Sequence, residues 1–186
     1  MTVEPSLRDE MLAALPSLRA FALSLSNDPV LADDLVQETI LRAWANTYRF
    51  APGTNLQAWL FTILRNVLLS EWRKRKREVE DGDGSYAATL RAYPDQQDHL
   101  DVDDLRAALA KLRLDQREAL LLVAAQGLSY EEAAAVCGVP VGTIKSRVNR
   151  ARHRLPELLG LDGAPDLGPD NVTKAALASL SLGSPA

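Results

Sequence analysis

The stretch Gly127–Arg147, GLSYEEAAAVCGVPVGTIKSR, decides the fold of the carboxy-terminal half because it has the pattern of a helix-turn-helix. Ser129 and Glu132 have the spacing of a capping box, which would start the first helix. Gly138 supplies the turn, since glycine adopts a left-handed backbone at little cost. The sequence therefore predicts a short capped helix, a tight turn and a second helix that begins at Val141.

The second helix, from Val141 to about Leu159, is predicted to have one apolar and one cationic face. At about 100° per residue, its apolar residues fall within about 80° of one another and would form a buried stripe. This stripe consists of Val141, Ile144, Val148, Ala151 and Leu155. The remaining surface can enter a DNA major groove, where Arg and Lys pair with phosphates or guanine edges and Asn reads adenine. The candidates for DNA contact are Thr143, Lys145, Ser146, Arg147, Asn149, Arg150, His153 and Arg154.

Charge is strongly segregated along the chain, although the net charge is only −4. Residues 65–77 contain six basic residues and one acid, and residues 141–155 contain five basic residues and no acid. Between them, residues 78–104 contain nine acids and one base. Two basic patches on either side of an acidic spacer indicate two contacts with one polyanion. The alternative is that each charge run only solvates a helix face.

Composition excludes several classes of protein. The single cysteine, Cys137, rules out an intramolecular disulfide framework and fits a reducing cytosol, and two histidines do not complete a metal site. No run approaches the roughly 18 apolar residues that a membrane span needs, and no leader opens the chain. A glycine-rich phosphate loop and a nucleophile–histidine pairing are also missing. We therefore expect a cytoplasmic protein that is not an enzyme, has no metal or other cofactor and does not contact a membrane.

Helical periodicity predicts an all-α fold with two small helical domains joined by a flexible acidic linker. In the first domain, one helix spans Leu7–Leu25 and is kinked or divided by Pro16. A second follows the break at Asn27-Asp28-Pro29, and a third spans about Leu56–Lys76. Helical signal returns at Asp104. The predicted boundaries are residues 1–78 for the first domain, 79–103 for the linker, 104–161 for the second domain and 162–186 for a tail.

The helix after Pro29 carries a stripe suited to docking a protein partner. Apolar and small residues, Trp44 among them, sweep a broad arc of this helix. The remaining stripe places one apolar anchor among hydrogen-bonding groups, which is the arrangement that a docking face needs. It consists of Asp34, Gln37, Glu38 and Leu41, with Arg42 at its edge. A lone exposed leucine is also normal on a protein surface, so the geometry by itself leaves both interpretations open.

Four segments resemble the extracytoplasmic function (group 4) sigma factors of bacterial RNA polymerase. DLVQETILRAW (34–44), YRF (48–50) and LQAWLFTILRN (56–66) resemble region 2 of this family, and GTIKSRVNRAR (142–152) resembles region 4. The resemblance covers about Leu7–Arg77 and Asp104–Leu159. The sequence Ser129–Arg152 also resembles that of the general-stress-response branch found in alphaproteobacteria.

The resemblance implies a function in transcription initiation. The docking stripe would bind the clamp helices of the polymerase β′ subunit, and the second domain would bind the β flap. The loop Tyr48–Asn55 and the next helix would capture an unpaired base of the −10 promoter element and hold nearby DNA. The residues carried over for this role are Tyr48, Asn55, Trp59, Arg65, Asn66, Arg73, Lys74, Arg75, Lys76 and Arg77. Lys145, Arg147 and Arg150 would face the −35 element, and an anti-sigma factor would control the protein.

The same −10 role has a physical basis in the residues. Promoter melting needs a site that takes up an unstacked base, and the aromatic side chains of Tyr48, Phe50 and Trp59 suit it, although Trp59 alone is more typical of a core residue. The main rival interpretation is a sigma-like mimic that sequesters an anti-sigma factor without promoter activity. Such mimics can lose their DNA-facing charge, whereas this chain keeps basic residues in both domains. An ordinary regulator with one helix-turn-helix would leave the first domain without a purpose.

Overall fold

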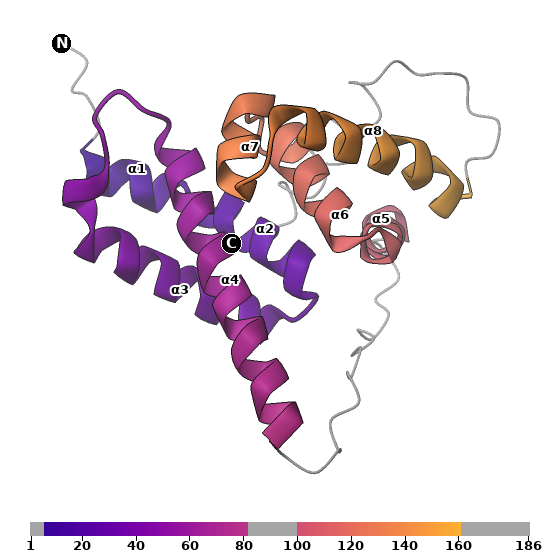
Figure 1. The fold of residues 1–186 in the computed structure, drawn as a ribbon, viewed down its shortest axis with the longest axis horizontal. Coiled ribbons are helices and arrows are strands. Elements are labelled where there is room, and N and C mark those ends of the chain that lie inside the picture. The colour runs from indigo at the N-terminus through magenta and orange to yellow at the C-terminus, as the bar shows by residue number, and fades with distance from the viewer. Residues whose placement is uncertain (1–5, 82–99, 161–186) are drawn as a thin grey trace. The chain divides into compact units, whose positions relative to one another are not determined.

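The structure, a computed structural model, describes residues 6–81 and 100–160, and within these ranges the chain is helical with no strand. The helices form two compact units, one built on α1–α4 and the other on α5–α8 (Figure 1). The predicted all-α fold with two small helical domains is confirmed. The tail and most of the predicted linker lie outside the described residues.

The first unit contains α1 (Leu7–Ala13), α2 (Leu15–Ser26), α3 (Pro29–Ala45), the short 3-10 helix η1 (Thr47–Arg49) and α4 (Leu56–Asp81). The predicted helix over residues 7–25 is divided, and Pro16 lies in the first turn of α2, where a missing backbone N–H costs little. Helix α4 continues to Asp81, within the segment assigned to the linker. Helices α3 and α4 pack against each other (Figure 1).

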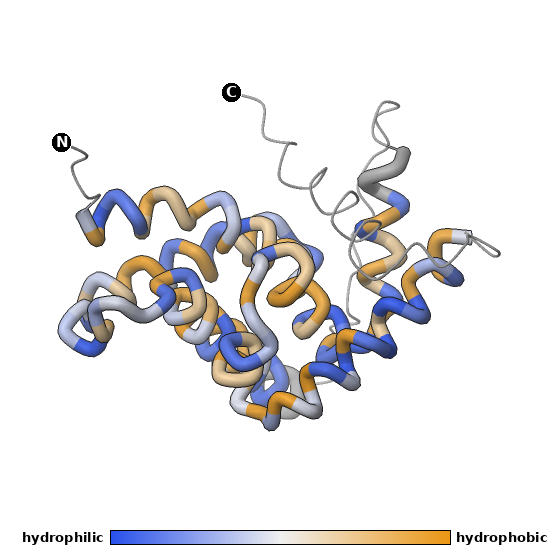
Figure 2. Tube along the Cα trace, turned by 90° about the horizontal axis from the view of Figure 1, so that it is seen from above, coloured by the Kyte–Doolittle hydropathy of each residue, from blue (hydrophilic) through white to orange (hydrophobic). Residues whose placement is uncertain are grey.

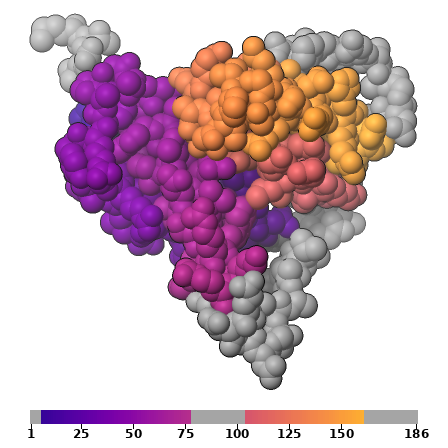
Figure 3. Space-filling model, viewed as in Figure 1, coloured from indigo at the N-terminus to yellow at the C-terminus, as the bar shows by residue number. Residues whose placement is uncertain are grey.

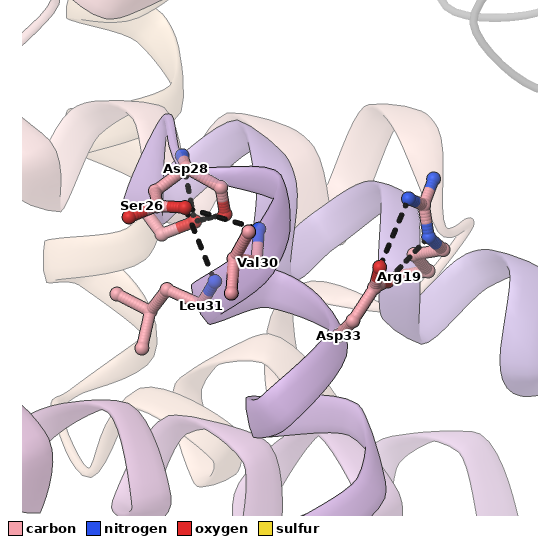
Figure 4. Close-up of polar contacts among 6 residues, drawn as sticks. All are labelled: Arg19, Ser26, Asp28, Val30, Leu31 and Asp33. Atoms are coloured by element: carbon pink, nitrogen blue, oxygen red, sulfur yellow. Dashed lines mark hydrogen bonds and ion pairs between the residues drawn. The ribbon is translucent and has the colours of Figure 1, made fainter. Parts of the chain in front are cut away.

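Asp28 starts α3 as the sequence predicts. Its Oδ1 accepts hydrogen bonds from the backbone N–H groups of Val30 at 3.0 Å and Leu31 at 3.2 Å (Figure 4). The Asp28 N–H in turn donates to Oγ of Ser26 at 3.3 Å, which joins the cap to the end of α2. These bonds satisfy N–H groups that have no partner within the helix. The corner between α2 and α3 is therefore fixed by local hydrogen bonds.

Two kinds of contact hold the first unit together. Apolar side chains form its core, in which the rings of Phe21 and Phe61 meet edge to face with centroids 4.9 Å apart. Outside the core, the Arg19 guanidinium donates to Asp33 through Nε at 2.6 Å and Nη2 at 3.3 Å (Figure 4). This two-point ion pair links α2 to α3. The orientation of α3, which carries the candidate docking stripe, is thus set by both core and surface.

The second unit contains α5 (Leu100–Lys111), α6 (Leu114–Leu120), the π-helix η2 (Leu121–Ala125), α7 (Tyr130–Cys137) and α8 (Val141–Leu158). Helix α5 begins before the predicted position at Asp104. The π-helix was not predicted from the sequence. It continues α6 with a wider turn, in which the Gln126 N–H donates to the Leu121 carbonyl at 3.0 Å.

The helix-turn-helix forms as predicted. The Ser129 N–H donates to Oε2 of Glu132 at 2.8 Å, and the Glu132 N–H donates to Oγ of Ser129 at 3.1 Å, so the capping box is complete. Gly138 ends α7 with φ of +66°, a left-handed conformation in which a side chain is strained. Cys137, which ends α7, is buried. The turn delivers the chain directly into α8.

Candidate polymerase and nucleic-acid interfaces

Helix α8 has the two faces that the sequence predicts. Its buried residues are Ile144, Val148, Ala151 and Leu155, whereas Val141, expected in the same stripe, is half-buried at the first turn. Apolar positions recur along an otherwise hydrophilic helix (Figure 2). The candidate DNA contacts on the opposite face are exposed. They are Lys145, Ser146, Asn149, Arg150, His153 and Arg154.

Three candidates on α8 have neighbours that restrict them. The ammonium group of Lys145 lies 5.8 Å from the centroid of the Tyr130 ring, within the range of a cation–π interaction. Thr143 is half-buried, and its carbonyl accepts a hydrogen bond from Oγ of Ser146 at 2.9 Å. Arg147 is half-buried and forms an ion pair with Asp115 of α6.

In the space-filling view, α7 and α8 lie at the surface of their unit (Figure 3).

The docking stripe of α3 is accessible. Asp34, Gln37 and Arg42 are exposed, and the Leu41 side chain is 58% exposed. Glu38 is half-buried and accepts a hydrogen bond at 2.6 Å from Nε of Arg42, one turn further along the helix. An apolar anchor surrounded by polar groups therefore stands on the surface, as the sequence predicts.

Trp44 is the residue of this face that sequence reasoning missed. The helical arc placed it with the apolar residues, but its side chain is 57% exposed. It lies three residues beyond Leu41, so both side chains belong to one face of α3. The signal was available in the spacing, because a tryptophan at i+3 from an exposed leucine extends the same face. Together they form an exposed apolar pair on a short stretch of helix.

The loop after α3 brings aromatic residues together at the start of α4. The rings of Phe50 and Trp59 lie 5.4 Å apart at an angle of 46°. Tyr48 is 75% exposed, and the Arg49 guanidinium lies 5.6 Å from the centroid of its ring. Asn55 accepts a hydrogen bond from the Ala58 N–H at 3.2 Å, so its side chain caps α4. This part of the chain thus contains one exposed ring, that of Tyr48, and one partly covered aromatic pair, Phe50 and Trp59.

The end of α4 forms a cationic surface. Arg73, Lys74, Arg75, Lys76 and Arg77 are all exposed, and the last turns of α4 extend beyond the other helices of the unit (Figure 1). Nε of Arg75 lies 3.1 Å from Oε1 of Glu71, which offsets one of these charges. Nearer the core, Arg65 is half-buried and Asn66 is exposed.

No helix in the described parts of the chain is long and apolar enough to cross a membrane.

Family models match both units. Sigma-70 region 2 matches residues 11–78, and sigma-70 region 4 matches residues 103–155. The chain is 63% identical to the ECF RNA polymerase sigma factor EcfG of Rhodopseudomonas palustris, over 95% of this chain and 98% of that protein. It is 40% identical to the ECF sigma factor SigC of Mycobacterium tuberculosis, over 76% of this chain and 73% of SigC.

Solved structures agree with these matches. The sigma factor RpoE of Bartonella quintana, crystallised in complex with the anti-sigma factor NepR, superposes with a TM-score of 0.75 and is 54% identical. The alignment covers 83% of this chain and 97% of RpoE. CnrH, solved with the cytosolic domain of CnrY, gives a TM-score of 0.54 at 27% identity and covers 81% of this chain and 84% of CnrH.

Proposed function

The chain belongs to the extracytoplasmic function sigma factors of bacterial RNA polymerase, and from this membership we propose how its surfaces divide the work of promoter recognition. It binds core polymerase and directs it to promoters in the cytoplasm, without catalytic chemistry of its own. Helix α3 docks on the enzyme, the loop before α4 and the end of α4 hold the −10 region, and α8 reads the −35 element. We propose that its regulon is a stress response, because Ser129–Arg152 resembles the general-stress-response branch of the family.

The docking proposal rests on the exposed apolar pair of α3. Leu41 and Trp44 would be buried against the clamp helices of the β′ subunit, and their burial supplies most of the attraction. Asp34, Gln37 and the Glu38–Arg42 pair surround these anchors with groups that can hydrogen-bond across the interface. This arrangement of an apolar centre and a polar rim is typical of specific protein interfaces.

The −10 proposal rests on aromatic residues and cations within one unit. Tyr48 offers an exposed ring on which an unpaired base can stack, and Phe50 and Trp59 add a second pair of rings to the same unit. The cationic end of α4 attracts the phosphates of the opened strands, largely without regard to sequence. Asn55 and Arg65 are less free for this role, because Asn55 caps α4 and Arg65 is half-buried.

The −35 proposal rests on the exposed face of α8, and this face is the single observation that carries the function. A capped short helix and a glycine turn present a helix whose outer surface holds Ser, Asn, Arg and Lys in reach of base edges and phosphates. A mimic that only sequesters an anti-sigma factor has no need for such a surface. An active sigma factor does need it.

An anti-sigma factor is the proposed regulator. RpoE, to which this chain is 54% identical over nearly the whole of RpoE, was solved with NepR bound. By similarity we propose that a protein of the NepR kind holds this chain inactive. Binding such a protein would cover surfaces that polymerase or promoter DNA otherwise contacts.

Reconstituted transcription tests the function. The full chain is added to core polymerase and a fragmented genomic library, and transcripts are sequenced with polymerase alone as the background. We expect new transcripts whose start sites share a −35 and a −10 sequence. Binding to core polymerase without any promoter-dependent transcript would support the mimic instead. The matched control is Arg150→Glu with Arg154→Glu, which should keep polymerase binding and lose the transcripts.

A further inference from the structure

Arg147 differs from the exposed residues of α8 in its surroundings. Its side chain is 20% exposed, and its Nε lies 3.4 Å from Oδ2 of Asp115, in the first turn of α6. The other carboxylate oxygen of Asp115, Oδ1, lies 3.4 Å from Nε of Arg113. Asp115 therefore has a cation beside each oxygen. One of these cations belongs to the helix that we propose enters DNA.

The ion pair joins two helices whose relative rotation matters. Helices α6 and α8 pack against each other, and α8 turns its apolar stripe inward. At about 100° per residue, Arg147 stands roughly 70° from the centre of that stripe, whereas Arg150 stands roughly 130° from it. Arg147 thus lies on the shoulder of α8. An apolar stripe tolerates small rotations of a helix. Rotation of α8 would, however, separate Arg147 from Asp115, so the ion pair opposes it.

Asp115 is a suitable fixed point for this contact. It occupies the first turn of α6, where the helix dipole favours a negative charge. Arg113, which is 78% exposed, balances its second oxygen from outside. The carboxylate is only about one-third exposed, so solvent screens the pair less than a pair on the open surface.

We propose that Asp115 and Arg147 are positioning residues for promoter recognition, and that Arg147 is not itself a DNA ligand. The ion pair sets the rotation of α8 on α6, and this rotation brings Asn149 and Arg150 to the base edges. The inference rests on the proposed function of α8 and assigns Arg147 a different role from the one expected by resemblance. Asp115 becomes a determinant of −35 specificity although it stands on another helix.

The opposite arrangement makes different predictions. If Arg147 leaves Asp115 to pair with a phosphate, Asp115 competes with DNA. Asp115→Asn would then leave DNA affinity unchanged or raise it, and Arg147→Gln would lower the salt dependence of binding by about 0.9 for one lost phosphate contact. Under the positioning role, both substitutions weaken binding by the same factor, because each removes the same ion pair.

The experiment uses the full chain bound to core polymerase and two DNA fragments. One is the promoter most strongly transcribed by the wild-type holoenzyme, and the other is the same promoter with its −35 element substituted. Affinities are measured over a salt series for the wild type, Asp115→Asn, Arg147→Gln and the double variant. Asp115→Glu tests rescue, since it keeps the carboxylate. Unfolding of each free protein is measured separately, with Arg150→Gln as the matched arginine control.

We expect Asp115→Asn and Arg147→Gln each to lower affinity for the matching fragment about threefold to fivefold, with the double variant no weaker than either. Preference for the matching fragment should fall by the same factor, the salt dependence should stay at the wild-type value, and Asp115→Glu should restore most of the preference. A purely structural role would change unfolding but not this preference. In the free protein, Asp115→Asn should couple to Arg147→Gln but not to Arg150→Gln.

Two results overturn the inference alone. One is a lowered salt dependence for Arg147→Gln while Asp115→Asn binds as tightly as the wild type. The other is additivity of the Asp115 and Arg147 substitutions in both unfolding and DNA binding. A wild-type holoenzyme that does not distinguish the two fragments would refute the proposed function of α8, and the inference with it.

Discussion

Replacing Trp44 with alanine is expected to weaken binding of the chain to core polymerase roughly 100-fold. An aromatic side chain of this size can bury about 200 Å², and 57% of the Trp44 side chain is exposed in the free protein. The area available to a partner is therefore about 110 Å². At about 25 cal/mol per Å², its loss corresponds to about 2.8 kcal/mol, or about two powers of ten in the dissociation constant.

Titration of labelled core polymerase with the full chain measures this effect. Leu12→Ala is the matched control, because Leu12 is also half-exposed and apolar but stands on α1. It should bind as the wild type does. The rest of the Trp44 side chain, about 90 Å², is covered in the free protein, so its loss should also lower the free energy of unfolding, by at most about 2 kcal/mol, which denaturant titration can check. A loss of affinity below threefold, or an equal loss for Leu12→Ala, would refute the assignment of α3 as the docking helix.

The other substitutions address DNA binding and stability. Lys74→Gln with Lys76→Gln should lower the salt dependence of holoenzyme binding to promoter DNA by about 1.4, which is two contacts with single-strand phosphates, and an unchanged slope in a filter-binding salt series would argue against DNA at the end of α4. Tyr130→Leu should weaken −35 binding by roughly two- to fivefold because Lys145 loses a ring worth about 0.5–1 kcal/mol, whereas Tyr130→Phe keeps the ring and should bind normally; equal effects of both would exclude the cation–π contact. Asp28→Ala should destabilise the first unit by about 1 kcal/mol in urea unfolding because two N–H groups lose their acceptor, and full stability would mean that water replaces the cap.

Features that depend on short stretches of sequence were predicted well. The capping box at Ser129 and Glu132, the turn at Gly138 and the cap at Asp28 each involve residues no more than a few positions apart, and all three form as expected. The buried stripe of α8 was also predicted, because helical periodicity alone defines it. The chemistry of neighbouring residues is enough to define these features.

Features that depend on tertiary packing were not predicted. Trp44 is apolar and was placed with the core arc, but more than half of its surface is exposed, and periodicity does not say where a neighbouring helix ends. The pairing of Asp115 with Arg147 requires the crossing of α6 and α8, which the sequence does not specify. The π-helix after α6 has the same origin, since its apolar residues suit an α-helix equally well. The assignment of individual residues to polymerase or DNA stays a prediction.

The Glu38–Arg42 pair has a consequence for how salt acts on the two kinds of binding. Glu38 already has a counter-charge one turn away, so a cation from the polymerase would exchange places with Arg42 and release few ions into solution. In the roles proposed for them, the cations of α4 and α8 would instead displace the ions that surround DNA. When the internal salt of a cell rises, the complex of this chain with core polymerase should therefore persist, whereas its affinity for promoter DNA should fall. Osmotic shock would then leave a reserve of assembled enzyme that resumes initiation as soon as the ions are removed.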